Sequence, residues 1–313
     1  MRIRLQPWQL AVSLVLLSSA FVGLVRWRQN RVRWGAEQMI AALPIDRATV
    51  LYADVATLRK AGIVDLLAGS KSAEDADYRN FVAQIGFDYR TDLDAVAAAF
   101  VNGESFYTVR GRFQWKQLAE YARTQGGECH YTTCSLPANE PGRKISFYPL
   151  RSDILALAVT SEHSGVEMIA PSSAKISGQV ATDPVWVTIP ASALTKPGAL
   201  PPGLQVLLGS AARAESLTLA AGPQGEHLQL RLSVVCKTAQ DAQAVKEEFS
   251  SATNALRNSS LPERAKAGQP APSQPDWVGF LRSGIFTQNG TEVMGTWPIE
   301  QSFLTALVSD GTP

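Results

Sequence analysis

Residues 94–111 read DAVAAAFVNGESFYTVRG, and this stretch predicts a β-hairpin with strands over 94–101 and 104–111. β-Branched and aromatic residues recur along the arms, as is typical of strands. The dipeptide Asn102-Gly103 supplies the positive φ angles that a tight two-residue turn requires. Because the arms of a hairpin pair antiparallel, the stretch favours a mostly antiparallel sheet over the doubly wound parallel sheet of nucleotide-binding folds.

The remaining elements extend from this hairpin in both directions along the chain. In the first half we expect strands over 49–55, 94–101, 104–111, 145–149 and 154–159. We expect helices there over 57–67, 78–85, 115–123 and 162–169. In the second half we expect strands over 185–189, 216–220, 227–235, 285–287 and 292–297. We expect helices there over 204–212, 239–257, 277–282 and 299–308, with a proline-rich linker at 262–275.

Both halves follow the order β-α-β-β-α, then a strand pair and a helix. This shared order indicates an internal duplication, although unrelated α+β units can produce the same order by chance. We therefore predict an α+β fold with helices packed on one face of a mostly antiparallel sheet. We expect residues 35–178 to form the first unit and residues 179–313 the second, after an N-terminal cytoplasmic tail, transmembrane anchor and basic flank at residues 1–34.

An uncharged run near the N-terminus predicts a transmembrane anchor. The run begins at Leu10 and ends at Val25, and Trp8 and Trp27 flank it. On a helix with a rise of about 1.5 Å per residue, the two tryptophans lie about 28 Å apart, close to the bilayer core thickness of about 30 Å. Tryptophan is enriched at membrane interfaces, so both residues are expected to act as interface anchors.

Two alternatives to this anchor stay open, and so does its orientation. Ser18 and Ala20 fit a signal-peptide cleavage site, but a cut after Ala20 would leave the apolar stretch 21–25 on the mature protein. A buried core helix is the other alternative. The arginines that follow the span favour a cytoplasmic body, whereas an apolar segment so close to the N-terminus usually acts as an export signal. We expect the body on the periplasmic or outer face.

The composition limits the classes of function. Lys and Arg number 29 against 28 Asp and Glu, and this balance gives no overall attraction to nucleic acid. The chain has only 3 cysteines and 3 histidines, which makes a multinuclear metal site unexpected. In an oxidising compartment, Cys129 and Cys134 would form a local disulfide across a hairpin. Two free thiols are the alternative.

One short stretch resembles a known group of proteins. Leu43-Pro44-x-Asp46, the strand Val50-Leu-Tyr-Ala-Asp54 and Leu58-Arg59 are similar to the opening of uncharacterised bacterial membrane-anchored proteins. The resemblance implies a location in the cell envelope. It assigns no activity and no functional residues.

Motifs for common chemistry are missing from the sequence. It contains neither of the usual glycine-rich phosphate loops, nor Gly-x-Ser-x-Gly, nor His-Glu-x-x-His. Cys129, His130, Cys134 and His163 could supply zinc ligands, but their spacing favours a structural hairpin. We therefore expect no cofactor and no metal.

Charged clusters offer the remaining candidate sites. Asp88, Arg90, Asp92 and Asp94 alternate in one loop, where capping and solvation explain them better than catalysis or calcium binding. Arg110 and Arg112 lie beside Phe113 and Trp115 and could bind an anion or stack on a base, but a solvated strand end explains them better. His227 is expected to be an ordinary strand residue.

These observations favour a non-enzymatic envelope protein that binds or scaffolds a partner next to the membrane. A carrier or sensor of a lipid or other hydrophobic ligand is the second hypothesis. An enzyme of unrecognised type is the third, and it would be favoured if Asp88, Asp92 or His227 lay inside a cleft.

Overall fold

The computed structural model describes residues 34–68, 76–171, 182–194, 213–224, 227–258, 276–300, 302–303 and 306. The predicted anchor at 10–25, the helix at 204–212, the linker at 262–275 and half of the helix at 299–308 lie outside these residues. In the described segments, no helix combines the length and the apolar character needed to cross a membrane. The chain separates into the units Met1–Gly35 and Ala36–Pro313, and the elements below belong to the second unit.

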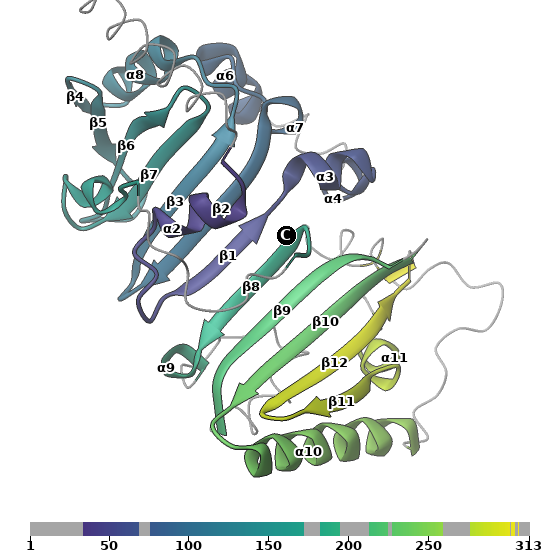
Figure 1. Cartoon of the computed structure of the whole chain (residues 1–313). Helices are drawn as coiled ribbons and strands as arrows, with labels where there is room; N and C mark the ends of the chain where they lie inside the picture. Colours follow the sequence, from purple (N-terminus) through teal and green to yellow (C-terminus); the bar gives the residue numbers. More distant parts are fainter. Residues whose placement is uncertain are drawn as a thin grey trace, which may run out of the picture. The chain divides into compact units, whose positions relative to one another are not determined.

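The first half contains seven strands and several short helices among its described residues (Figure 1). Its elements are α2 Ala36–Ala41, β1 Thr49–Ala53, α3 Val55–Lys60, α4 Ile63–Ala68, α6 Ala76–Ile85, α7 Tyr89–Asp92, β2 Leu93–Val101, β3 Glu104–Gly111, α8 Trp115–Thr124, β4 Glu128–His130, β5 Thr133–Pro137, β6 Lys144–Arg151, β7 Ile154–Thr160 and the 3₁₀ helix η1 Gly165–Met168.

In the part of the second half that the structure describes, there are fewer strands and one long helix. Its elements are β8 Val185–Pro190, α9 Ala191–Leu194, β9 Ala214–Gln224, β10 His227–Cys236, α10 Ala239–Asn258, α11 Trp277–Arg282, β11 Ile285–Asn289 and β12 Glu292–Ile299.

Within the described residues, all strands belong to one antiparallel sheet of 12 strands, which confirms the predicted α+β fold class. The strand order is β11-β12-β10-β9-β8-β1-β2-β3-β7-β6-β5-β4. The predicted hairpin is present as β2 and β3, with φ angles of 53° at Asn102 and 80° at Gly103. The first strand of each half, β1 and β8, pair with each other at the middle of the sheet. One continuous sheet therefore runs through both halves.

The two halves share their strand order, and one row of directly paired residues runs through both. Outward from the central pair, the order is β1-β2-β3-β7-β6 on one side and β8-β9-β10-β12-β11 on the other. A row of directly paired residues crosses each half, starting from Leu51 opposite Val187. In the first half the row is Leu51, Ala98, Tyr107, Leu157 and Phe147. In the second half it is Val187, Leu219, Leu232, Gly295 and Phe286.

Helices cover both faces of the first half of the sheet, so the prediction of helices on one face is wrong. On one face, the Thr108 hydroxyl donates a hydrogen bond to the Met39 carbonyl of α2 (3.0 Å), and the Ser146 hydroxyl accepts one from the Val166 N–H of η1 (3.1 Å). Phe147, the next residue along β6, points to the opposite face and packs in the cluster beneath α8. The prediction failed because the residues on the α2 face are small and give a weak hydrophobic signal. Four of them are 0% exposed: Ala97, Ala99, Ala156 and Ala158.

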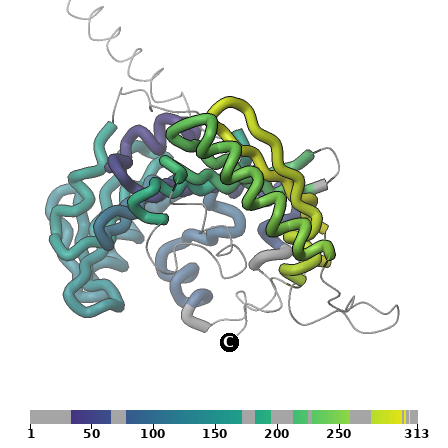
Figure 2. The backbone as a smooth tube through the Cα atoms, turned by 90° about the horizontal axis from the view of Figure 1, so that it is seen from below, coloured from purple at the N-terminus to yellow at the C-terminus, as the bar shows by residue number. Residues whose placement is uncertain are grey.

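The second half places its core beneath α10 and α11. Leu232, Val234, Val245, Phe249 and Trp297 belong to one buried cluster there. Leu232 lies in the same row of directly paired residues as Phe147, so the two side chains point to the same face of the sheet. α8 and α10 therefore cover the same face. Figure 2 shows α10 in green beside the yellow strands β11 and β12.

Candidate functional site

Two hollows open onto the surface of the first half. One, of about 400 Å³, lies between α6 and α8 and is lined by Gln84, Gln117, Glu120, Tyr121, Thr124 and Gln125. The other, of about 410 Å³, is lined by Gly86, Asp92, Gly111, Arg112, Phe113, Gln114, Ser152 and Asp153. The second hollow holds Asp92 and Arg112 from the sequence-predicted candidates, so it is the candidate site.

Hydrogen bonds occupy both carboxylate oxygens of Asp92. Its Oδ1 accepts hydrogen bonds from Arg112 Nε (3.0 Å) and Nη2 (2.8 Å), and its Oδ2 accepts one from the Asp88 backbone N–H (2.9 Å). Burial acts to raise the pKa of Asp92, but the hydrogen bond from Asp88 and the hydrogen bond and charge of Arg112 outweigh it, so the pKa lies below its ordinary value. The charged Asp92 side chain therefore links α7 to Arg112, the residue that follows β3.

Asp88 also has a structural role, as the N-cap of α7. Its Oδ1 accepts hydrogen bonds from the Arg90 backbone N–H (2.8 Å) and from the Tyr78 hydroxyl (2.7 Å). Burial, followed by this bond to Asp88, raises the pKa of Tyr78 well above its ordinary value. The structure thus brings Asp88 and Asp92 together through capping contacts, as the sequence suggested.

The hollow is shaped by close backbone packing at its floor. A Cβ atom added to Gly111 would lie 2.5 Å from the backbone oxygen of Asp92. Next to it, Phe87 and Phe113 stack with ring centroids 5.0 Å apart. Trp115 tilts against Phe113 at 5.4 Å, so these two aromatic rings pack against protein rather than forming an open stacking platform.

The other charged candidates lie apart from this hollow. Asp94 is 4.0 Å from Arg59 Nη1 in an ion pair whose side chains are 24% and 28% exposed. Arg110 interacts with the Tyr52 hydroxyl; burial, and then the charge of Asp54, raise the pKa of Tyr52 in spite of Arg110. His227 pairs with Gln224 at the start of β10.

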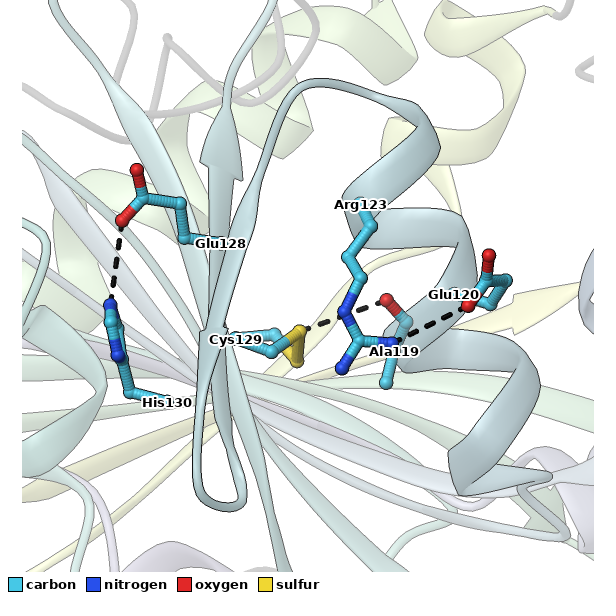
Figure 3. Close-up of a disulfide and its surroundings, with 7 residues drawn as sticks. Ala119, Glu120, Arg123, Glu128, Cys129 and His130 are labelled. Atoms are coloured by element: carbon cyan, nitrogen blue, oxygen red, sulfur yellow. Dashed lines mark hydrogen bonds and ion pairs between the residues drawn. A yellow bond between two sulfur atoms is a disulfide. The ribbon is translucent and has the colours of Figure 1, made fainter.

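The predicted disulfide is present. Cys129 and Cys134 are directly opposite each other in β4 and β5, with Cα atoms 4.0 Å apart and their sulfur atoms bonded. Figure 3 shows Cys129 pointing toward Ala119 of α8, with its Sγ 3.7 Å from the Ala119 carbonyl oxygen. A positive φ of 54° at Tyr131 closes the turn.

The hairpin does not assemble the zinc ligands that the sequence raised. His130 points away from the disulfide, and its Nε2 lies 3.4 Å from a carboxylate oxygen of Glu128 (Figure 3). His163 instead contacts Ser135 and Lys144. No group of three or more His, Cys, Asp or Glu side chains suited to a metal occurs in the described part of the chain.

No local signal in the sequence indicates the contact that joins the two halves. Tyr52 of β1 and Trp186 of β8 lie in the central strand pair, with ring centroids 6.1 Å apart. Both residues were predicted to lie in strands, but their pairing depends on a contact between distant segments. The membrane anchor residues Trp8, Leu10, Val25 and Trp27 lie outside the described residues.

Comparison with known proteins gives little further information. No family model matches the chain, and no curated protein matches it. Crystal form IV of TP0453 aligns with a TM-score of 0.48 and 13% identity, over 88% of this chain and 97% of that one. Crystal form I gives 0.46 and 11% over 88% and 98%, and crystal form III gives 0.46 and 14% over 87% and 97%. Similarity at this level does not assign a function.

Proposed function

We propose that this chain is a single-pass membrane-anchored envelope protein whose body binds or scaffolds a partner on the periplasmic or outer face. Residues 10–25 serve as the anchor, as their apolar character and flanking tryptophans predict. The body is the antiparallel α+β unit that follows.

The observation that carries this proposal is the disulfide between Cys129 and Cys134. Disulfides persist in oxidising compartments and are rare in the cytoplasm. This one closes the β4–β5 hairpin, and Cys134 is 3% exposed beneath α8, so the oxidised pair is part of the packed sheet. An oxidised structural pair supports an extracytoplasmic body.

Asp92 lines the candidate hollow, a position that would favour an enzyme, but its contacts support binding over catalysis. Asp92 has donors on both oxygens, and its pKa lies below its ordinary value and so further from neutral pH. A general acid or base needs a pKa near the working pH and a free position for substrate. Asp88 is likewise occupied by capping contacts.

The sheet supports the further proposal that the two halves arose by duplication. Two chains of unrelated origin can share an order of elements by chance. A shared strand order over five strands in each half, counted from β1 and from β8, is a more demanding agreement.

Thiol labelling of intact cells with a membrane-impermeant reagent tests the location. The full chain carries Cys236→Ser, which leaves only the disulfide pair to react, and a matched chain also carries Cys129→Ser and Cys134→Ser as the unlabelled control. We expect labelling of intact cells only after reduction. Labelling that needs lysis but no reductant would place the body in the cytoplasm and contradict the proposal.

Membrane extraction tests the anchor separately. Alkaline washing should leave the full chain in the membrane fraction, whereas a chain that lacks residues 1–34 should be released. Release of the full chain by the wash would contradict the anchor. Retention of the shortened chain would show that the body itself holds to the membrane.

A further inference from the structure

The edge of the sheet at β11 has no strand beside it among the described residues. β11 pairs with β12 only, and the five residues Ile285–Asn289 carry no charge. Ile285 is 63% exposed, and Met294 of the neighbouring strand is 40% exposed. Natural edge strands are usually protected by charges, proline, bulges or a covering segment, because an open edge accepts further strands.

The first half shows what fills the corresponding edge. Phe286 of β11 lies in the same row of directly paired residues as Phe147 of β6, and β11 and β6 hold the same place in the shared strand order. The outer edge of β6 is occupied by the antiparallel strand β5, whose Cys134 lies directly opposite Phe147. Cys134 is 3% exposed and packs beneath α8. The position beside β11 and beneath α10 is the equivalent place in the second half.

Two residues of β11 direct their backbone N–H and C=O groups toward the position beside its outer edge. Gly290 and Thr291 form a two-residue turn between Asn289 and Glu292, so those two flanking residues form a hydrogen-bonded pair. Alternation along the strand then directs the N–H and C=O groups of Phe286 and Gln288 away from β12. The Gln288 side chain is held aside by hydrogen bonds to the carbonyl oxygens of Ala239 (2.9 Å) and Gly290 (3.0 Å).

We propose that β11 accepts an antiparallel strand from a partner protein, paired through Phe286 and Gln288. The chemistry of the partner follows from β5: an extended, uncharged segment with a small apolar side chain opposite Phe286. A second copy of β11 fits less well, because its own side chains on that face are Phe286 and Gln288, both larger than Cys134. This inference rests on the proposed binding role and is independent of the location of the body.

Peptide binding to the purified full-length chain tests the proposal. The probe is a fluorescent peptide with the sequence of residues 131–138 carrying Cys134→Ala, and a peptide of scrambled order is its control. Gln288→Pro removes an outward N–H without affecting the pairing with β12. Gln288→Ala is the matched variant, because it loses the same side-chain contacts and keeps the N–H.

We expect wild type and Gln288→Ala to bind the peptide equally, and Gln288→Pro to bind about tenfold more weakly or worse. Equal binding by Gln288→Pro, or no saturable binding up to about 1 mM peptide, would overturn the proposal. Neither result would affect the thiol labelling that tests location.

Amide hydrogen exchange in the wild type covers the case in which Gln288→Pro does not fold. The amides of Phe286 and Gln288 should exchange rapidly in the free chain and slowly with peptide, whereas the Thr287 amide should be protected in both. Protection of Phe286 and Gln288 without peptide would overturn the proposal. Protection that rises with protein concentration would identify a second copy as the occupant, and protection at every concentration would identify this chain itself.

Discussion

Reduction of the Cys129–Cys134 disulfide should lower the free energy of unfolding by about 2 kcal/mol. The two cysteines are separated by 5 positions, so the bond closes a short loop in the unfolded chain. The chain-entropy relation for a loop of about six residues gives about 7 cal/mol/K, which is about 2 kcal/mol at 25 °C. A longer loop would give more, and this short one sets the modest size of the expected effect.

Urea unfolding of the full chain with and without reductant measures this difference. Cys129→Ala combined with Cys134→Ala provides the control, because its stability should not respond to reductant. Since Cys134 is buried among Phe147 and Leu155, the double variant also loses some packing, and only the response to reductant is compared. If the wild type unfolds at the same urea concentration before and after verified reduction, the disulfide contributes no net stability and the reasoning fails.

Three further predictions concern the first half and are measured by equilibrium unfolding. Asp92→Asn should lower the free energy of unfolding by only about 1 kcal/mol at neutral pH, since its Arg112 partner is exposed. Because the pKa of Asp92 is lowered in the fold, this difference from wild type should be complete above the ordinary value of 3.8 and shrink as the pH falls below it. A difference that persists in acid would contradict this prediction. Gly111→Ala should cost about 1–3 kcal/mol, because its Cβ would lie 2.5 Å from a backbone oxygen; a neutral change would show that the strand end can shift. Thr108→Val should cost about 1 kcal/mol by removing the hydrogen bond to the Met39 carbonyl, whereas Thr108→Ser should keep that bond, and equal losses in both would indicate packing instead.

Local signals in the sequence predicted much of the fold. Asn102-Gly103 predicted the β2–β3 turn, and both residues have the positive φ angles that such a turn needs. Cys129 and Cys134 predicted a stapled hairpin, because their separation allows only a local bridge. Helix 57–67 was predicted as continuous but is divided into α3 and α4 at Gly62, whose φ of 72° interrupts a helix.

Contacts between distant segments could not be predicted in the same way. The pairing of β1 with β8 joins residues more than a hundred positions apart, and neither strand contains a turn or motif that names its partner. Burial of both sheet faces in the first half was missed because alanine gives a weak hydrophobic signal. Ala97 and Ala99 read as part of one apolar strand, although they line the face that α2 covers.

The candidate site was only partly predictable. Alternating carboxylates at Asp88 and Asp92 suggested capping, and both residues do cap or brace α7. Arg112 was assigned to a solvated strand end, and its two hydrogen bonds to Asp92 Oδ1 were not foreseen because the two residues are 20 positions apart, on either side of a hairpin. Side chains that meet only after the sheet has formed leave no local pattern.

The two edges of the sheet differ in a way that bears on function. At one end, β4 has three residues, Glu128 and His130 are exposed there, and a disulfide fixes the hairpin, so several features oppose further strand pairing. At the other end, β11 is longer and uncharged, and Ile285 is largely exposed. Selection against aggregation normally removes such an edge unless something occupies it. If the halves share an origin, the hairpin that protects β6 has no counterpart beside β11 in the described residues, and a partner strand there would complete the symmetry of the sheet.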